Sequence, residues 1–488
     1  MRLLLIPLVC FASIVGVAQQ SRPSLTPQQI GAIDRFVEQE RVREQIPGVE
    51  VGIYSRGKLL LAKGYGQANV ELDVPVKAAT IMQSGSTGKQ FVATAMMMLV
   101  EQHKVSLDDS VRKYFPAAPE WWEPIRIKNL LSHTSGLTEY ETGASFTDPN
   151  DPFYLRKDFT EAELATKIEA LPRENAPGEK WNYRNTNFVL LGIVIHQVSG
   201  QFYGDYLHDH IFAPLGMTST HIISDRDIVK GRAAGYELVK GAWKNQQWVS
   251  PTFNSTADGT LYYNVLDLAK WDEALYSTRL VSQASLDRMW TVFPLNDGKP
   301  NPVDYGFAWY IDTQKGHKRI AHSGAWQGFT TGIVRYPDDA LGIAVMTNLD
   351  SGHARPMNMA RVIAGLVDPA LLPDRLEAIK DDRPALATAV RRFLDETVAG
   401  HDTRALLTAD AAKAMTLERA DEQRRLLAQV EPGGVLTLLK RENTKEPEGT
   451  LSLYRLGKQD KAMLVLCAMD GDSRISSFDI LPDRDYDW

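Results

Sequence analysis

The sequence predicts a mixed α/β (α+β) protein: an antiparallel sheet flanked by helices, with an inserted helical domain, followed by a small C-terminal α+β domain. Strand-like runs occur at residues 48–66 and return at residues 305–349, whereas helical patterns and long polar loops dominate residues 86–288. The simplest arrangement builds one sheet from both ends of this region and places the helical layer between them. Clefts form preferentially at such junctions.

The length of 488 residues predicts at least two domains. We assign residues 19–366 to the main domain, residues 367–384, rich in proline and charge, to a linker, and residues 385–488 to the small domain. In the last segment one helical pattern, around residues 388–397, precedes four strand-like runs. No metal, phosphate or nucleophile pattern occurs there, so the role of this domain stays open.

The N-terminal segment is typical of a secretory signal peptide over residues 1–18. Arg2 precedes an apolar stretch, Leu3–Ala18, that ends in small residues. A membrane anchor is the alternative, but the stretch is shorter than the roughly 20 residues of a spanning helix. We therefore expect an exported protein, periplasmic or extracellular, with no stable membrane span after cleavage. Its one remaining cysteine, Cys467, allows no internal disulfide.

Composition excludes some partners. Hydrophobic residues make up 44%, charged residues 24%, and the formal net charge is -7, so no basic excess predicts nucleic-acid binding. His208 and His210 stand close together, but no further clustered ligands accompany them. The sequence therefore predicts no metal and no cofactor, and it gives no oligomeric state.

Three Ser-x-x-Lys patterns begin at Ser55, Ser86 and Ser110. Ser55 lies in a predicted hairpin turn and Ser110 in a short charged segment. Only Ser86 opens an apolar helix, where unpaired N–H groups and the helix dipole favour an alkoxide and a later oxyanion. Ser86 is therefore the candidate nucleophile.

Lys89 follows one turn later on the same helix face as Ser86. Apolar neighbours would exclude water from its amine, and burial lowers the pKa of a lysine, so the neutral amine can accept the serine proton. The alternative is structural: Ser86 caps the helix and the Lys89 side chain extends to water.

Five stretches follow one another along the chain: "SGSTGKQF", "NLLSHTSGL" from Asn129, "WNYRNTNFVLLG" from Trp181, "IFAPLGM" from Ile211 and "AHSGAWQGF" from Ala321. In these stretches the chain resembles the serine β-lactamase and penicillin-binding-protein superfamily, in its class C β-lactamase, D,D-peptidase and esterase branch. The resemblance spans roughly residues 46–349 in family order and implies a β-lactamase-like fold.

The resemblance implies further catalytic residues. Tyr-x-Asn occurs at Tyr183 and again at Tyr262, and we choose the first because an apolar helix follows it. Tyr183 would pass a proton to the leaving group, and Asn185 would hold Lys89 and the substrate. Packing alone is the alternative for both residues. Arg184, between them, would either supply a positive charge or point to solvent.

The stretch "HSG", His322 to Gly324, matches the triad that the family places on the strand edging the site. His322 is implied as catalytic, and Ser323 and Gly324 line the substrate edge. The N–H of Ala325 joins that of Ser86 as the oxyanion hole. A strand-end histidine with a turn glycine is the structural alternative.

We therefore expect a hydrolase that acts through an acyl-enzyme on small-molecule or peptide substrates, including cell-wall-derived ones. β-Lactamases typically carry lysine where His322 stands, so esters or D-amino-acid peptides should be better substrates than penicillins. No separate glutamate motif for deacylation is recognisable, so Tyr183 with Lys89 would also activate water. One alternative is a penicillin-binding protein that is acylated without efficient turnover; another is an interaction protein that works through its C-terminal tail.

Overall fold

The computed structural model describes residues 24–222, 226–350, 354–428, 434–445, 448–457 and 462–483. The predicted signal peptide, residues 1–18, lies outside these ranges. Within these ranges, none of the helices combines the length and the hydropathy of a membrane-spanning segment.

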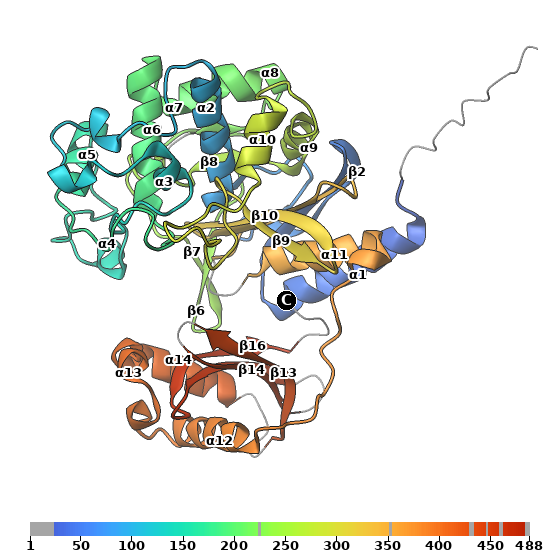
Figure 1. Cartoon of the computed structure of the whole chain (residues 1–488). Helices are drawn as coiled ribbons and strands as arrows, with labels where there is room; N and C mark the ends of the chain where they lie inside the picture. Colours follow the sequence, from blue (N-terminus) through green and yellow to red (C-terminus); the bar gives the residue numbers. More distant parts are fainter. Residues whose placement is uncertain are drawn as a thin grey trace, which may run out of the picture.

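A seven-stranded antiparallel sheet is the base of the main domain (Figure 1). Its order is β3-β2-β1-β12-β11-β10-β9. The strands are β1 (Gly48–Ser55), β2 (Lys58–Asn69), β3 (Val74–Pro75), β9 (Tyr310–Gln314), β10 (His317–Trp326), β11 (Phe329–Tyr336) and β12 (Leu341–Thr347). β1 and β12 pair at the centre, with Val49 opposite Thr347 and Ser55 opposite Leu341. The prediction of one sheet built from both ends of this region is confirmed.

Two helices cover one face of this sheet, α1 (Pro27–Arg43) and α11 (Pro356–Val367) (Figure 1). Thr26 caps α1, because its hydroxyl accepts a hydrogen bond from the backbone N–H of Gln29 at 3.2 Å. The apolar sides of both helices share a buried core with the strands beneath them.

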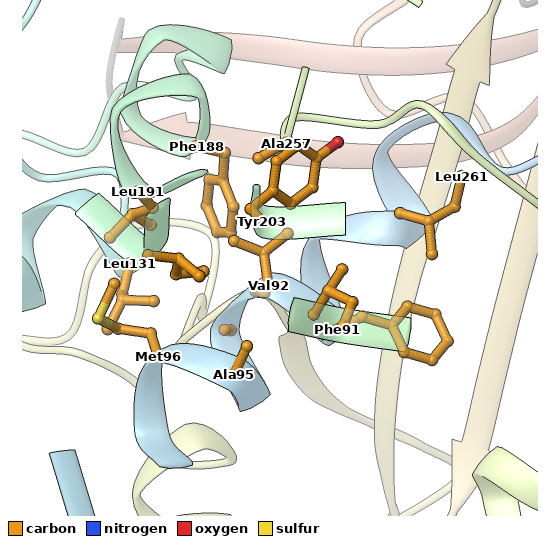
Figure 2. Close-up of a cluster of buried hydrophobic side chains, with 14 of the residues drawn as sticks. Phe91, Val92, Ala95, Met96, Leu131, Phe188, Leu191, Tyr203, Ala257 and Leu261 are labelled. Carbon is orange, nitrogen blue, oxygen red and sulfur yellow. The ribbon is translucent and has the colours of Figure 1, made fainter. Parts of the chain in front are cut away.

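The opposite face carries the helical layer. Its helices are α2 (Lys89–Glu101), α3 (Ile127–Leu131), α4 (Gly143–Thr147), α5 (Glu161–Glu169), α6 (Asn185–Ser199), α7 (Tyr203–Leu207), α8 (Ala213–Leu215), α9 (Val265–Ala274) and α10 (Gln283–Met289). Figure 2 shows how α2 is embedded: Phe91, Val92 and Met96 lie in one cluster with Phe188 and Leu191 of α6. This apolar packing explains why α2 is hydrophobic on nearly all sides.

Short strands complete the main domain. β8 (Leu261–Tyr263) pairs with β4 (Met82–Gln83) and with β5 (His221–Ile222). The β4–β8 pairing brings the residues just before Ser86 beside the loop that leads into β8. A separate hairpin, β6 (Tyr236–Val239) with β7 (Ala242–Asn245), extends toward the C-terminal domain (Figure 1).

The C-terminal domain has its own antiparallel sheet, in the order β13-β14-β15-β16, and its own hydrophobic core. Its elements are α12 (Pro384–Val398), α13 (Ala409–Ala414), α14 (Leu417–Leu427), β13 (Leu436–Lys445), β14 (Glu448–Leu456), β15 (Met463–Asp470) and β16 (Ile475–Pro482). Phe393 of α12 packs on Phe478 of β16, with ring centroids 4.8 Å apart.

Two local features differ from the sequence prediction. Residues 305–309 form no strand, because the chain turns there and Ala308 adopts a φ of +63° before β9 begins. The sequence analysis missed helices α13 and α14. α13 has only six residues, too few to show a helical period, and the many charged residues of α14 obscure its apolar spacing.

Candidate active site

Ser86 lies in a short 3-10 helix, Gly85–Gly88, that leads directly into α2. Gly85 has a φ of +52°, and a Cβ at this position would stand only 2.2 Å from the backbone nitrogen of Ala325. Glycine satisfies both the conformation and the close approach. The turn therefore places the candidate nucleophile against the end of β10.

Lys89, the first residue of α2, is fully buried. Its Nζ donates hydrogen bonds to Ser86 Oγ at 2.9 Å, to Asn185 Oδ1 at 2.8 Å and to the backbone carbonyl of Asp258. Burial lowers the pKa of Lys89 to about 8, although nearby carboxylates oppose the shift. A substantial fraction of the amine is therefore neutral near pH 8 and able to accept the Ser86 proton.

Asn185 begins α6 and connects the amine to two carboxylates. Its side-chain oxygen accepts from Lys89, its Nδ2 donates to Glu141 Oε2 at 3.2 Å, and its backbone N–H donates to Glu139 Oε2 at 2.6 Å. The negative charge of Glu139 is also stabilised by the positive end of the α6 dipole, which lies at this first turn. These contacts fix the amide that orients Lys89.

Tyr183 lies beside the pair, with its ring centroid 5.1 Å from Lys89 Nζ and 4.2 Å from the ring of His133. Burial raises the pKa of the Tyr183 phenol, and the adjacent Ser86 hydroxyl works against that rise. The phenolic oxygen forms no hydrogen bond of ordinary geometry with any residue that the structure describes. Tyr183 is thus a neutral phenol next to the nucleophile, suited to giving rather than taking a proton.

His322 is buried behind Tyr183, with ring centroids 6.2 Å apart. Its Nε2 accepts from the Tyr305 hydroxyl at 2.9 Å, and its Nδ1 donates to the Ser323 carbonyl at 2.5 Å. Burial, helped by the charge of Lys89, lowers the pKa of His322 to about 3. The imidazole is therefore neutral and offers no positive charge to a substrate carboxylate.

The rest of the triad borders Ser86. A Cβ on Gly324 would lie 2.2 Å from the Ser84 carbonyl oxygen and 2.8 Å from the Ser86 nitrogen, so glycine is needed for this approach. Ser323 is exposed next to it. Ser86 and Ala325, whose backbone amides are the predicted oxyanion hole, line one pocket together.

This pocket has a volume of about 50 Å³. It is lined by Ser86, Glu141, Asn185, Asp258, Gly259, Thr260, Ala325 and Trp326. These residues come from five separate parts of the chain. They are the 3-10 helix, the loop that follows α3, the start of α6, the loop that precedes β8, and the end of β10.

Three acidic residues of the site escaped the sequence analysis: Glu139, Glu141 and Asp258. The Tyr140 hydroxyl donates to Asp258 Oδ2 at 2.8 Å, which ties the two loops together. Glu139 and Glu141 follow the stretch "NLLSHTSGL" by two and four residues, but no spacing rule distinguishes them from other loop carboxylates. Only the tertiary contact with Asn185 identifies them.

The competing sequence patterns occupy structural positions. Ser110 caps a 3-10 turn by accepting from the Arg112 N–H at 3.3 Å, and Ser55 ends β1. Tyr262 is buried in β8. Arg184 forms an ion pair with Glu174 at 2.8 Å instead of facing the pocket.

Fold and site together define a serine-hydrolase-type protein with a β-lactamase-like fold, as the sequence predicted. The family model described as Beta-lactamase matches residues 33–367, and the chain belongs to this family.

Individual relatives agree with this assignment. Penicillin-binding protein 4* of Bacillus subtilis (strain 168) is 28% identical over 304 residues, 60% of this chain and 66% of that protein, so the chain spans just under two thirds of this relative. The octameric penicillin-binding protein homologue from Pyrococcus abyssi shares the fold at a TM-score of 0.62 and 24% identity, covering 93% of this chain and 99% of that one. A D-stereospecific amidohydrolase from Streptomyces sp. has a TM-score of 0.57 at 25% identity, over 66% and 94%.

Proposed function

We propose that this protein is an exported serine hydrolase that forms an acyl-enzyme on Ser86 and acts on carboxylic esters or on peptides and amides of D-amino acids. The observation that carries the proposal is the buried Lys89 amine 2.9 Å from Ser86 Oγ. Similarity to a D-stereospecific amidohydrolase supports the amide substrates. The apolar stretch Leu3–Ala18 supports export.

In acylation, neutral Lys89 takes the Ser86 proton as Oγ attacks the substrate carbonyl carbon. The carbonyl oxygen becomes an oxyanion, which the backbone amides of Ser86 and Ala325 stabilise. Tyr183 then donates its proton to the leaving group and regains one from the Lys89 ammonium. The bond to the leaving group breaks, the acyl group stays on Ser86, and Lys89 is neutral again.

Penicillins should be poor substrates. Their carboxylate would need a cation at the strand edge, where His322 is neutral because burial lowers its pKa to about 3. We expect ester or D-amino amide turnover to exceed penicillin turnover at pH 7, and parallel rate measurements on these classes test the order.

A tagged fluorophosphonate, followed by peptide mapping, tests the nucleophile. Labelling should fall on Ser86 and vanish in Ser86→Ala, whereas Ser55→Ala, which alters a second Ser-x-x-Lys serine, should label normally. Labelling elsewhere contradicts the proposal. Labelling of Ser86 without turnover of any ester, D-amino amide or D-Ala-D-Ala peptide would favour a penicillin-binding protein instead.

Cell fractionation tests export. The protein should be found in the periplasmic or extracellular fraction, and its presence in the cytoplasmic fraction alone would contradict this part of the proposal.

A further inference from the structure

The pocket beside Ser86 contains a carboxylate that the acylation step does not use. The described residues lining it include Glu141 and Asp258, whereas Lys89 and Tyr183 are not among them. A volume of about 50 Å³ is sufficient for a water molecule. A water molecule in this pocket would therefore share it with both Ser86 and the Glu141 carboxyl group.

Glu141 is held in place by the residue that also holds Lys89. Asn185 Nδ2 donates to Glu141 Oε2 at 3.2 Å, while Asn185 Oδ1 accepts from Lys89. One amide thus orients the amine on one side and the carboxylate on the other. Asp258 is engaged differently, because its Oδ2 accepts from the Tyr140 hydroxyl and its backbone carbonyl accepts from Lys89.

The surroundings of Glu141 increase its affinity for a proton. Burial together with the charges of Asp258 and Glu139 raises the pKa of Glu141 to about 8, against the opposing effects of Lys89 and the Asn185 hydrogen bond. A carboxylate whose pKa lies near the working pH is an efficient proton acceptor. Burial raises the pKa of Tyr183, so its phenol stays protonated and cannot accept the proton of water.

We propose that Glu141 is the general base that activates water for hydrolysis of the acyl-enzyme; this inference rests on the proposed function. Glu141 takes a proton from water as the water oxygen attacks the ester carbonyl carbon. The tetrahedral intermediate collapses, and the bond between that carbon and Ser86 Oγ breaks. Glu141 returns the proton to the departing Ser86 oxygen, which leaves a free carboxylic acid and the original enzyme.

The test uses the full-length Glu141→Gln variant with p-nitrophenyl acetate. We expect a burst of p-nitrophenol equal to the enzyme concentration, acetyl-enzyme visible by intact mass, and deacylation slowed by about 10²- to 10⁴-fold. The wild-type deacylation rate should rise with pH through about 8, and the variant should lose this dependence. Formate should partly restore deacylation in Glu141→Ala.

Controls separate the possible failures. Fluorophosphonate should still label Ser86 of Glu141→Gln completely, and the thermal unfolding of this variant should match the wild type. Glu120→Gln, which changes an exposed glutamate outside the pocket lining, should turn over normally. Wild-type deacylation in Glu141→Gln overturns the inference. So does a defect confined to substrates with a free amino group, which would make Glu141 a recognition residue. Absence of labelling at Ser86 in the wild type would refute the proposed function itself.

Discussion

Lys89 and Glu141 are both ionisable, both desolvated and both bound to Asn185, yet burial moves their pKa values in opposite directions. It lowers that of the amine and raises that of the carboxyl, each to about 8. Because burial favours the neutral form in both cases, the site carries less charge near neutrality than its residue types suggest. Because the two pKa values are similar, moving a proton from one of these groups to the other costs little free energy.

The pKa of Lys89 makes a prediction for acylation. The neutral fraction of the amine grows as pH rises, so the fluorophosphonate labelling rate should increase through about pH 8 and then level off. Lys89→Arg keeps a permanent charge and should slow labelling by about 10²-fold or more, without that pH dependence. Lys113→Arg, at the exposed lysine of another Ser-x-x-Lys pattern, is the matched control and should behave as wild type.

At the scale of elements, the site depends on contact between the 3-10 helix and β10. Gly85→Ala would place a Cβ 2.2 Å from the Ala325 nitrogen at a φ of +52°, so we expect both lower stability and loss of labelling as β10 moves away from Ser86. Gly143→Ala is the control, since no described atom lies within 4 Å of its added Cβ. Thermal melts and labelling rates measure both variants.

The central strand β1 carries a buried acid outside the site, Glu50. Its Oε1 accepts from the Val265 N–H at 3.2 Å, and its Oε2 has no partner among the described residues. Burial raises the pKa of Glu50 well above 4.5. The folded state therefore keeps a proton that the unfolded state releases above about pH 4.5, so Glu50 costs stability as pH rises.

Glu50→Gln removes this titration. We expect the variant to gain on the order of 1–3 kcal/mol over the wild type near pH 7, with the difference disappearing near pH 4. Chemical denaturation across that range measures it. Glu123→Gln, at a side chain 63% exposed, should show no such pH dependence.

Periodicity located most strands of both sheets, because each runs between turn residues with strong β formers. The Ser-x-x-Lys pattern before an apolar helix located Ser86 and Lys89, because their spacing is local. Glu141 and Asp258 could not be predicted in this way, since they meet through loops whose path is set by tertiary packing. The burial of His322 against Tyr305, which lowers its pKa to about 3, depends on tertiary packing that the sequence does not reveal.

At the scale of the whole molecule, the C-terminal domain has a hydrophobic core separate from the two cores of the main domain. Phe393 is fully buried in it. Phe393→Ala should cost about 3–5 kcal/mol and lower one of two calorimetric transitions, while Ser86 labelling stays unchanged below that transition. A single shifted transition with loss of labelling would contradict this independence.

The pairing of β1 with β12 has a consequence for biosynthesis. Residue 49 finds its partner at residue 347, so the middle of the sheet stays open until the ribosome has made nearly the whole domain. Contacts this distant along the chain slow folding and leave unpaired edges exposed in the meantime. The nascent polypeptide therefore cannot complete this sheet until its last strand, about 300 residues after the first, has left the ribosome.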